Sequence, residues 1–434
     1  MARGVLALVV GQEADGSWRV PLESDASVTA FALLLRQYLG RLPDTETLRD
    51  FVSYLRATQS ADGGWQLYPG GPDNPDASVL VYTALKVCGV PSGDPVLMAA
   101  RRSISRMGGL DSICQPARTL LALLGQLPVA HLPYGSVRLL HEQQGRHPFL
   151  DLMGILALGS VVMMRLGTSA AVRPLPESLY LSELRADNPS RQGRVGSMEI
   201  VDIPPQGFRC GRISRFFWSM NRILDRRLPV SDADSRADQW LLRQQGKDGV
   251  FAGMLLPTGF ALAALDQLPG EHEAVINRGL EGWSFFEARD RRGGWYQFSL
   301  ASAHDTAQAL RALWEYSEDA SLQPALRAKE FLVSQFQAVT VEGSGGWTFG
   351  SSGYPDADTT AIVLWALLPF QALHQTVVAR GVDWLLQMQS YNGGWAPYSA
   401  VTGPVAKLIA SGLFTGYADL PDVDVTARVL RVLG

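Results

Sequence analysis

One short pattern recurs along this chain and restricts the folds that it can adopt. In each copy a glutamine precedes an aromatic residue by six positions, and a glycine between them marks a turn. The copies are Gln12–Trp18, Gln59–Trp65, Gln245–Phe251 and Gln389–Trp395, and two altered units keep only Gly294-Trp295 and Gly346-Trp347. From Phe251 onward the aromatic residues are 44, 52 and 48 residues apart. Such a period indicates a repeat architecture.

The segments around each turn predict a pair of helices. An amphipathic helix, such as the one containing residues 385–389, ends in the polar turn, and a more apolar helix follows after a short loop. Residues 77–87, 305–314 and 360–368 are examples of the second helix, with apolar residues at helical spacing. No segment has the pattern of a long strand. The sequence therefore predicts an all-α fold, either an open α-solenoid or a closed α/α toroid.

The glutamine and the tryptophan of each unit have a structural explanation. A glutamine in the last helical turn can bond backbone groups that the helix end leaves without partners. A tryptophan beside it buries a large ring and connects one hairpin to the next. The repeats therefore predict architecture and give no evidence of activity.

Composition excludes several classes of protein. Apolar residues make up 47% of the 434 residues and charged residues 18%, which is typical of a globular chain, and the length favours about two domains. The net charge of −4 and the lack of a basic cluster argue against nucleic acid as a partner. Cys88, Cys114 and Cys210 have no zinc-ligand or disulfide spacing, which favours a reducing cytoplasm. The N-terminus lacks the pattern of a signal peptide.

The longest apolar stretch runs from residue 152 to residue 164. It is shorter than the roughly 20 residues that a membrane-spanning helix needs. Two interpretations stay open, a buried core helix and a patch that enters one leaflet of a membrane.

Several motifs together resemble the squalene–hopene and oxidosqualene cyclases. They are the Gln–Trp repeats, Asp62-Gly63-Gly64-Trp65 with Tyr68-Pro69-Gly70-Gly71-Pro72, Arg173-Pro174-Leu175-Pro176, and the segment from Gly294 to Ala307. The resemblance covers the whole chain. It implies two α/α barrels, with an inserted domain at residues 20–290 and a second domain formed by residues 1–19 and 291–434. It also implies an apolar cavity between them and monotopic attachment to the cytoplasmic face of a membrane, and it leaves a homodimer open.

The segment Tyr354–Ala361 is the most informative one for chemistry. Taken alone, its Asp and Thr residues have the pattern of a helix N-terminal cap. It also resembles the Asp-X-Asp-Asp-Thr-Ala motif of these cyclases, whose middle Asp is the general acid. The resemblance assigns that role to Asp358 and matches Asp356 to the first Asp. Protonating an alkene requires a carboxyl that keeps its proton in an apolar cavity, and it requires no metal and no redox cofactor.

The resemblance also implies residues around the acid. Phe349 and Tyr398 match aromatic residues that line the family's cavity, where aromatic faces stabilise cations. Ordinary core packing explains these two residues equally. Asp424, in Asp424-Val425-Thr426-Ala427, matches a segment near the acid.

The chain departs from the family pattern beside the acid. Thr359 replaces the last Asp of the motif, and a similar motif occurs in some bacterial cyclases of farnesyl diphosphate. Arg428 stands where squalene–hopene cyclases can carry a His. An arginine that contacts Asp358 would favour its ionised form, whereas one that points away, or pairs with Asp356 or Asp424, would be harmless. The sequence leaves these orientations open.

Further departures concern the cavity and the chain end. His304 and Leu120 stand where the squalene enzymes tend to have tryptophans, and a neutral His304 could act as the base that ends the reaction. The chain stops in a helix that family members continue, and the resemblance therefore implies an incomplete second barrel.

Three functions follow as alternatives. The first is a class II terpene cyclase (a lyase or isomerase) that converts squalene or a similar linear polyprenoid into a hopene-like triterpene. The second is a class II cyclase of a C15 or C20 prenyl diphosphate, of the drimenyl or copalyl type, which would need Mg²⁺. The third is a non-catalytic toroid fragment.

Overall fold

The computed structural model describes residues 2–113, 115–127, 172–184, 241–267, 272–317, 323–339, 343–350, 353–398, 400–402 and 419–434. The apolar stretch 152–164, Cys114 and Cys210 lie outside these ranges. Each helix within the described ranges is too short or too polar to span a bilayer.

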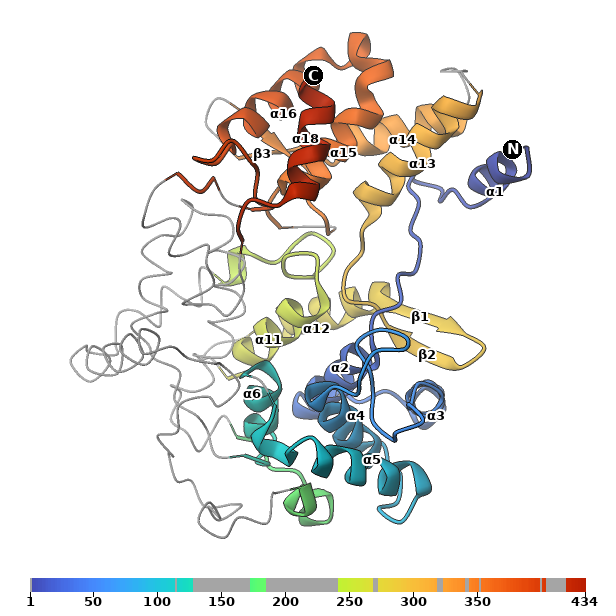
Figure 1. Cartoon of the computed structure of the whole chain (residues 1–434), viewed down its shortest axis with the longest axis vertical. Coiled ribbons are helices and arrows are strands. Elements are labelled where there is room, and N and C mark those ends of the chain that lie inside the picture. The colour runs from blue at the N-terminus through green and yellow to red at the C-terminus, as the bar shows by residue number, and fades with distance from the viewer. Residues whose placement is uncertain are drawn as a thin grey trace, which may run out of the picture.

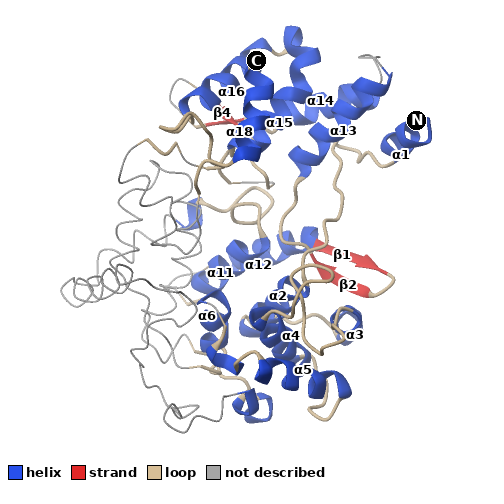
Figure 2. Cartoon of the chain, in the orientation of Figure 1, coloured by secondary structure: helices blue, strands red, loops and turns tan. Residues whose placement is uncertain are grey.

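Most of the described residues lie in helices that short turns connect (Figures 1 and 2). The α-helices are α1 (Ala2–Val10), α2 (Ala26–Tyr38), α3 (Thr45–Ala57), α4 (Pro75–Val87), α5 (Pro95–Arg106), α6 (Gln115–Leu123), α11 (Leu255–Leu265), α12 (Glu273–Trp283), α13 (Ser302–Ser317), α14 (Gln323–Ser334), α15 (Ala357–Leu367), α16 (Gln375–Gln387) and α18 (Val423–Leu433). Short 3₁₀ helices cover Gly109–Asp111, Glu177–Leu179, Ser182–Leu184, Ser284–Phe286 and Leu368–Leu373. The strands are β1 (Glu287–Asp290), β2 (Gly293–Tyr296), β3 (Gln337–Ala338) and β4 (Gly345–Gly346).

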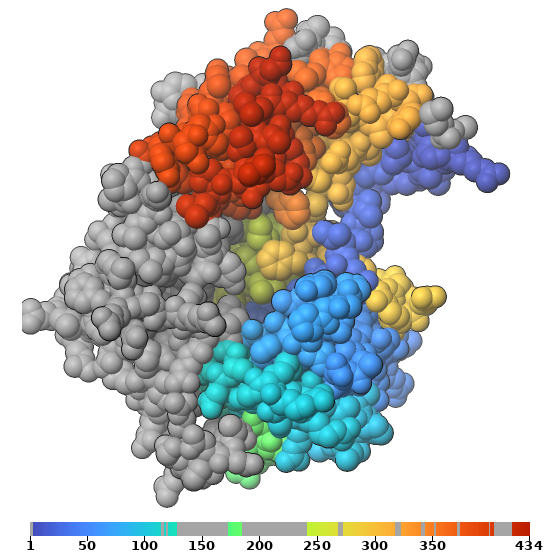
Figure 3. Space-filling view, in the orientation of Figure 1, coloured from blue at the N-terminus to red at the C-terminus, as the bar shows by residue number. Residues whose placement is uncertain are grey.

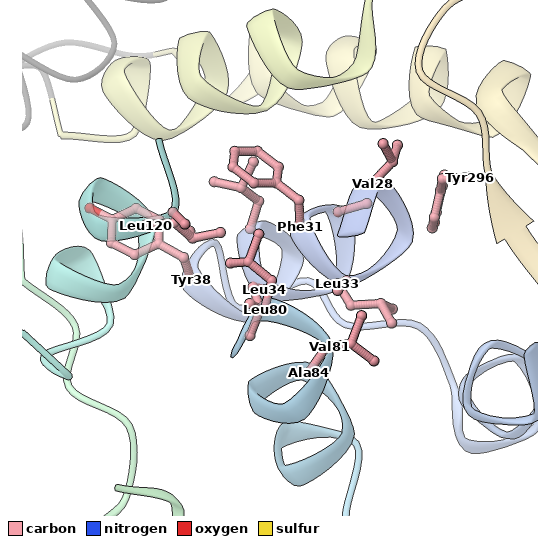
Figure 4. Packing of buried hydrophobic residues seen from close by; sticks show 14 of the residues in the cluster. Val28, Phe31, Leu33, Leu34, Tyr38, Leu80, Val81, Ala84, Leu120 and Tyr296 are labelled. Carbon is pink, nitrogen blue, oxygen red and sulfur yellow. The ribbon is translucent and has the colours of Figure 1, made fainter. Parts of the chain in front are cut away.

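Helices α2, α4, α6 and α11 contribute to one hydrophobic core, called here the first core, whose buried residues run from Ala26 to Leu300. Helix α2 packs on α4 and α11, and Phe31 of α2 meets Phe260 of α11 edge to face at 5.1 Å. Figure 4 shows part of this packing. Burial of these large apolar side chains is the main term that stabilises this half of the fold.

The second core is formed by Trp18 and by buried residues from Ala303 to Val429. Helix α15 is buried on nearly every side and packs between α13 and α18. Helix α16 instead buries one face, with Val378, Gly381 and Trp384 at helical spacing. This alternation of buried and amphipathic helices agrees with the helix pairs that the repeats predict.

Two extended segments connect the two sets of helices (Figure 1). The backbone N–H of Leu22 donates to Oε1 of Gln297 at 3.1 Å, and that of Phe298 donates to Oγ of Ser24 at 3.0 Å, so the segments run side by side. The second core therefore combines Trp18, from the N-terminal part of the chain, with residues from Ala303 onward. The division into domains at residues 20 and 290 stays a prediction.

The glutamines of the turns bond backbone carbonyls on both sides. Nε2 of Gln59 donates to the carbonyl of Gly63 in its own turn and to that of Val96 in the first turn of α5, both at 2.9 Å. Gln12 and Gln245 repeat this arrangement with α14 and α12. The indole N–H groups of Trp18, Trp65, Trp347 and Trp395 donate to carbonyls of the helix that precedes the turn, at 2.6–2.8 Å. These bonds agree with the structural interpretation of both residues.

The two altered units form short β-hairpins, which an all-helical pattern does not include. β1 pairs antiparallel with β2, and β3 pairs with β4. In both units the segment between the preceding helix and the Gly-Trp pair is long enough to fold back and pair with itself. β4 ends directly before Trp347, and β2 contains Trp295 and ends at Tyr296, so an aromatic residue stands at the end of each hairpin.

Candidate functional site

We call the helix that follows each turn an inner helix. Three inner helices begin in the same way, and one of them carries the predicted acid motif. The backbone N–H of the N-cap residue donates to the carbonyl of the turn tryptophan, and a hydroxyl four positions later accepts the N–H of that tryptophan. The caps are Asn74, Asp356 and Asp422, and the hydroxyl residues are Ser78, Thr360 and Thr426. Asp356 and Thr360 are thus part of the repeat architecture.

Asp356 is the buried carboxyl of the motif. Its side chain is 3% exposed, and its Oδ1 accepts the backbone N–H of Thr359 at 2.7 Å, which caps α15. Its Oδ2 has no hydrogen-bond partner among the described residues. Burial raises the pKa of Asp356 to about 7, against the opposing hydrogen bond from Thr359, and the charge of Asp358 adds to the rise. This carboxyl therefore keeps a proton well above the usual range of an aspartic acid.

Asp358 is the second residue of α15, two positions after the cap, and makes a different contact. Its Oδ1 accepts Nη1 of Arg428 at 2.5 Å, while Nη2 of Arg428 donates to Oδ2 of Asp424 at 2.7 Å. Arg428 thus makes two of the contacts that the sequence leaves open, one with Asp358 and one with Asp424. The side chain of Asp358 is 26% exposed and that of Asp424 is 72% exposed, so Asp358 is the more enclosed carboxylate of the pair.

The surroundings of Arg428 favour its charged form. Partial burial acts to lower the pKa of Arg428, but the hydrogen bond and the charge of Asp358, together with Asp424, raise it overall. A permanently charged guanidinium therefore faces the predicted acid.

Tyr398 lies against the same group of carboxyls. Burial raises the pKa of Tyr398 strongly, and the charges of Asp356, Asp419 and Asp358 add to the effect. Its backbone N–H donates to Oδ1 of Asp419 at 3.1 Å, and Asp419 is only 2% exposed. The sequence interpretation missed Asp419, whose only signal is an acidic residue in the loop before α18. Tyr398 also packs against the first core, so these carboxyls lie where the two cores meet.

The loop before the motif meets the first core as well. Gly350 and Gly353 lie so close to the backbone of Gly253 and Ala252 that an added Cβ would approach it within 2.7–3.0 Å. The hydroxyl of Tyr354 donates to Oε1 of Gln244 at 3.0 Å. In the space-filling view, residues of the 241–267 segment are visible between the two sets of helices (Figure 3). The acid motif is therefore positioned by contacts with the first core.

Phe349 and His304 lie together on this side of the second core. Their rings meet edge to face with centroids 6.1 Å apart, and both side chains are partly buried. The backbone of Phe349 faces the carboxyl of Asp356 and acts to lower its pKa. Phe349 and Tyr398 thus lie next to the motif carboxyls, and His304 lies against the ring of Phe349.

Leu120 does not join this group. It lies on α6, is fully buried in the first core, and appears there with Tyr38 and Leu34 of α2 (Figure 4). Its contacts are those of a core leucine, and a role in lining a cavity stays a prediction.

The arrangement combines two carboxyls with different surroundings. Asp356 lies in an apolar site that favours the neutral acid, and Asp358 lies beside a fixed positive charge. Pairs of acids whose surroundings differ in this way are typical of sites that transfer protons. The neighbouring aromatic rings could stabilise a cation.

Comparisons with known proteins agree with this arrangement. Residues 1–292 match the Squalene-hopene cyclase N-terminal domain, and residues 300–434 match the Squalene-hopene cyclase C-terminal domain. Together these matches cover nearly the whole chain. They confirm the α/α-toroid fold class, which the repeats leave open beside a solenoid and which the resemblance implies.

The chain is also similar to individual known proteins. The chain is 31% identical to squalene–hopene cyclase of Alicyclobacillus acidocaldarius, over 100% of this chain and 70% of that protein. It is 29% identical to enfumafungin synthase of Hormonema carpetanum, over 98% of this chain and 34% of that protein. Among solved structures, abietadiene synthase from Abies grandis aligns with a TM-score of 0.39 and 14% identity, over 100% of this chain and 48% of that chain.

The family matches extend over both halves of the chain, and the predicted acid motif lies at a junction of its two cores. The chain therefore belongs to the squalene–hopene cyclase family of class II terpene cyclases.

Proposed function

We propose that this chain protonates a terminal alkene of squalene, or of a similar linear polyprenoid, and converts it to a hopene-like triterpene. The observation that carries the proposal is the convergence of Asp356, Asp358 and Tyr398 where the two cores meet. It groups a proton donor with aromatic surface and keeps both close to the apolar interior. The proposed reaction uses neither a metal nor a redox cofactor.

Asp358 is the proposed proton donor. A protonated Asp358 can keep Oδ1 as the acceptor of Arg428 and carry its proton on Oδ2, because a carboxylic acid retains a carbonyl acceptor. The positive charge of Arg428 then stabilises the carboxylate that remains after transfer.

In the first step the alkene π electrons form a bond to this proton. The O–H bond of Asp358 breaks, and its electron pair stays on the carboxylate oxygen. The resulting tertiary cation is attacked by the next alkene of the same chain, and each further ring moves the positive charge along. Proton loss to a base or addition of water ends the reaction. His304 is a proposed base, while Phe349 and Tyr398 are proposed to stabilise the cations.

The first experiment is mass spectrometry of products from the purified chain incubated with squalene. Asp358→Asn, which cannot donate a carboxyl proton, is expected to form no cyclised product. Asp76→Asn is the matched control, because Asp76 holds the equivalent position two residues after the cap of α4, away from the site. Absence of product with the unmodified chain would contradict the proposed squalene substrate.

A second candidate substrate is a C15 or C20 prenyl diphosphate. It is favoured by Thr359, which replaces the last Asp of the family motif and removes one negative charge beside Asp358. Such a substrate would bring Mg²⁺ bound to its diphosphate. The test is incubation with farnesyl and geranylgeranyl diphosphates with and without Mg²⁺, and product formation that exceeds the squalene activity would favour this alternative.

We also propose that the chain acts at the cytoplasmic face of a membrane as a peripheral, monotopic protein. Squalene partitions into bilayers, so an enzyme that acts on it benefits from contact with the lipid surface. Flotation with phospholipid vesicles tests this proposal, and a chain that stays in the dense fractions would contradict it. Sedimentation of the purified chain decides between a monomer and a homodimer.

A further inference from the structure

The same kind of hydrogen bond occurs at six turns of the described residues. In each, the backbone N–H of the aromatic residue at the turn donates to a Ser or Thr hydroxyl near the start of an inner helix, at 2.8–3.0 Å. The pairs are Trp18–Thr306, Trp65–Ser78, Phe251–Thr258, Tyr296–Thr29, Trp347–Thr360 and Trp395–Thr426. We refer to this bond as the turn–helix bond. All of the hydroxyl residues except Thr426 are completely buried.

At Trp347 the turn–helix bond closes a small ring of contacts around the acid motif. Thr360 accepts the N–H of Trp347 at 3.0 Å, and the carbonyl of Trp347 accepts the N–H of Asp356 at 3.0 Å. Gly346 lies so close to Thr360 that any added Cβ would overlap its hydroxyl. The turn is therefore held directly against the first turn of α15, which carries both motif carboxyls.

The turn–helix bond at Trp395 fixes the partner helix. Thr426 accepts the N–H of Trp395 at 3.0 Å and lies between Asp424 and Arg428 on α18. Two residues after Trp395, the carbonyl of Pro397 accepts the N–H of Ala357 in α15 at 2.8 Å. The second turn thus connects the helix that carries Arg428 to the helix that carries Asp358.

We infer that Thr360 and Thr426 are positioning residues for the proposed acid, in addition to their place in the repeat. Their two turn–helix bonds set the first turns of α15 and α18 relative to each other, and the contact between Asp358 and Arg428 depends on that setting. This inference rests on the proposed function. In proton transfer a misplacement of about 1 Å can cost on the order of a hundredfold in rate, so a bond that fixes backbone near the carboxyls has a large effect on turnover.

The repeat supplies its own control for a test. Thr29 makes the same bond to Tyr296 at 2.9 Å, is equally buried, and lies in the first core on α2. Thr29→Val and Thr360→Val remove the same hydroxyl and leave the same kind of backbone N–H without an acceptor. We expect the two variants to lose similar amounts of thermal midpoint, because their structural loss is the same.

Turnover and titration separate the two sites. Thr360→Val is expected to lose at least about tenfold more of kcat with squalene than Thr29→Val, and Thr360→Ser, which keeps the hydroxyl, is expected to recover most of it. Independently of activity, ¹³C NMR of aspartate-labelled protein follows the Asp356 carboxyl. In Thr360→Val the loosened turn admits water, so the pKa of Asp356 is expected to fall from about 7 toward its ordinary value, while Thr29→Val leaves it unchanged.

Each outcome is decisive. Equal effects of Thr360→Val and Thr29→Val on both kcat and the Asp356 titration would overturn the inference. If no variant, nor the unmodified chain, cyclises squalene, the proposed function fails, but the titration still tests the positioning role. If Thr360→Val does not fold, Thr426→Val takes its place, because Thr426 is less buried and its loss is expected to change the same two readouts.

Discussion

Arg428 of α18 reaches across to Asp358 at the start of α15 and donates to its Oδ1 at 2.5 Å, although the two residues are 70 positions apart in the chain. The same guanidinium also holds Asp424, one helical turn before it. Asp358 therefore faces a fixed positive charge where the related squalene enzymes can carry a titratable histidine. If Asp358 donates a proton, the carboxylate that remains is paired with this fixed positive charge.

Replacing Arg428 should slow cyclisation. In Arg428→Gln the carboxylate that remains on Asp358 after proton transfer loses its paired cation, so we expect the maximal rate of cyclisation to fall by about tenfold. The measurement is a pH–rate profile of product formation.

Arg431→Gln is the control for this change. It removes a positive charge from the same helix, and Arg431 stacks on the ring of Trp365 at 3.9 Å without a contact to Asp358. We expect its pH–rate profile to match that of the unmodified chain. An equal loss of rate in both variants would mean that net charge, and not the Asp358 contact, is responsible.

The buried carboxyl of Asp356 should make stability depend on pH. Burial raises its pKa from 3.8 to about 7, so the folded chain keeps this proton while the unfolded chain releases it near pH 4. The stabilisation is fully present below about pH 4 and is lost as the pH rises through about 7. Relative to Asp356→Asn, the unmodified chain is expected to lose on the order of 5 °C of thermal midpoint between pH 4 and pH 8.

Asp422→Asn is the matched control for Asp356→Asn, because both residues cap an inner helix and an asparagine can still accept the capping N–H. Asp422 is exposed, and its substitution should leave the pH dependence unchanged. Thermal scans of all three proteins at pH 4, 6 and 8 make the comparison. Parallel curves for Asp356→Asn and the unmodified chain would contradict a buried neutral Asp356.

The repeat glutamines should differ in their contribution to stability. Nε2 of Gln59 donates to Gly63 and Val96, whereas Nε2 of Gln389 donates to Gly393 at 3.0 Å and, among the described residues, reaches no second helix. At about 1 kcal/mol for each bond, Gln59→Ala should cost about 2 kcal/mol in the free energy of unfolding and Gln389→Ala about half of that. Urea denaturation measures both values, and equal losses would show that the bond to the next helix contributes nothing.

Two glycines of the turns allow a similar comparison. Gly249 and Gly393 have positive φ angles of 86° and 83°, so alanine is strained at either position by about 1–2 kcal/mol. At Gly249 the added Cβ would also overlap the carbonyl of Arg278 on α12, whereas no atom lies within 4 Å of it at Gly393. Gly249→Ala should therefore lower the urea midpoint clearly more than Gly393→Ala. Equal midpoints would indicate that α12 moves away at no cost.

The local structure of this chain could be predicted because its signals are local. The spacing of Gln59 and Trp65 predicts a turn between two helices, and the structure contains that turn with the expected backbone bonds. The same reasoning predicted that the Asp and Thr residues of Tyr354–Ala361 cap a helix, and in the structure Asp356 is that cap. These features depend on residues within about one helical hairpin, so sequence periodicity is enough to reveal them.

The site was only partly predictable. The resemblance to the cyclase family singled out Asp358, Asp424 and Arg428, and these three residues do lie together. It also pointed to Leu120, which lies in the first core and whose role in lining a cavity stays a prediction, and it missed Asp419, which the fold places beside Tyr398. Nothing in the spacing of Asp419 distinguishes it from an ordinary loop residue.

The sequence by itself determined the helical repeat, the turn chemistry and the carboxyls available for proton transfer, because each depends on residue types at short separations. Only the tertiary structure decided which carboxyl is buried, where Arg428 binds, and that the motif lies where the two cores meet. Those properties arise when α15 packs against α18 and the loop before it packs against the first core. Burial and charge pairing are set by neighbours that are distant in the chain, and a linear pattern does not encode which neighbours those are.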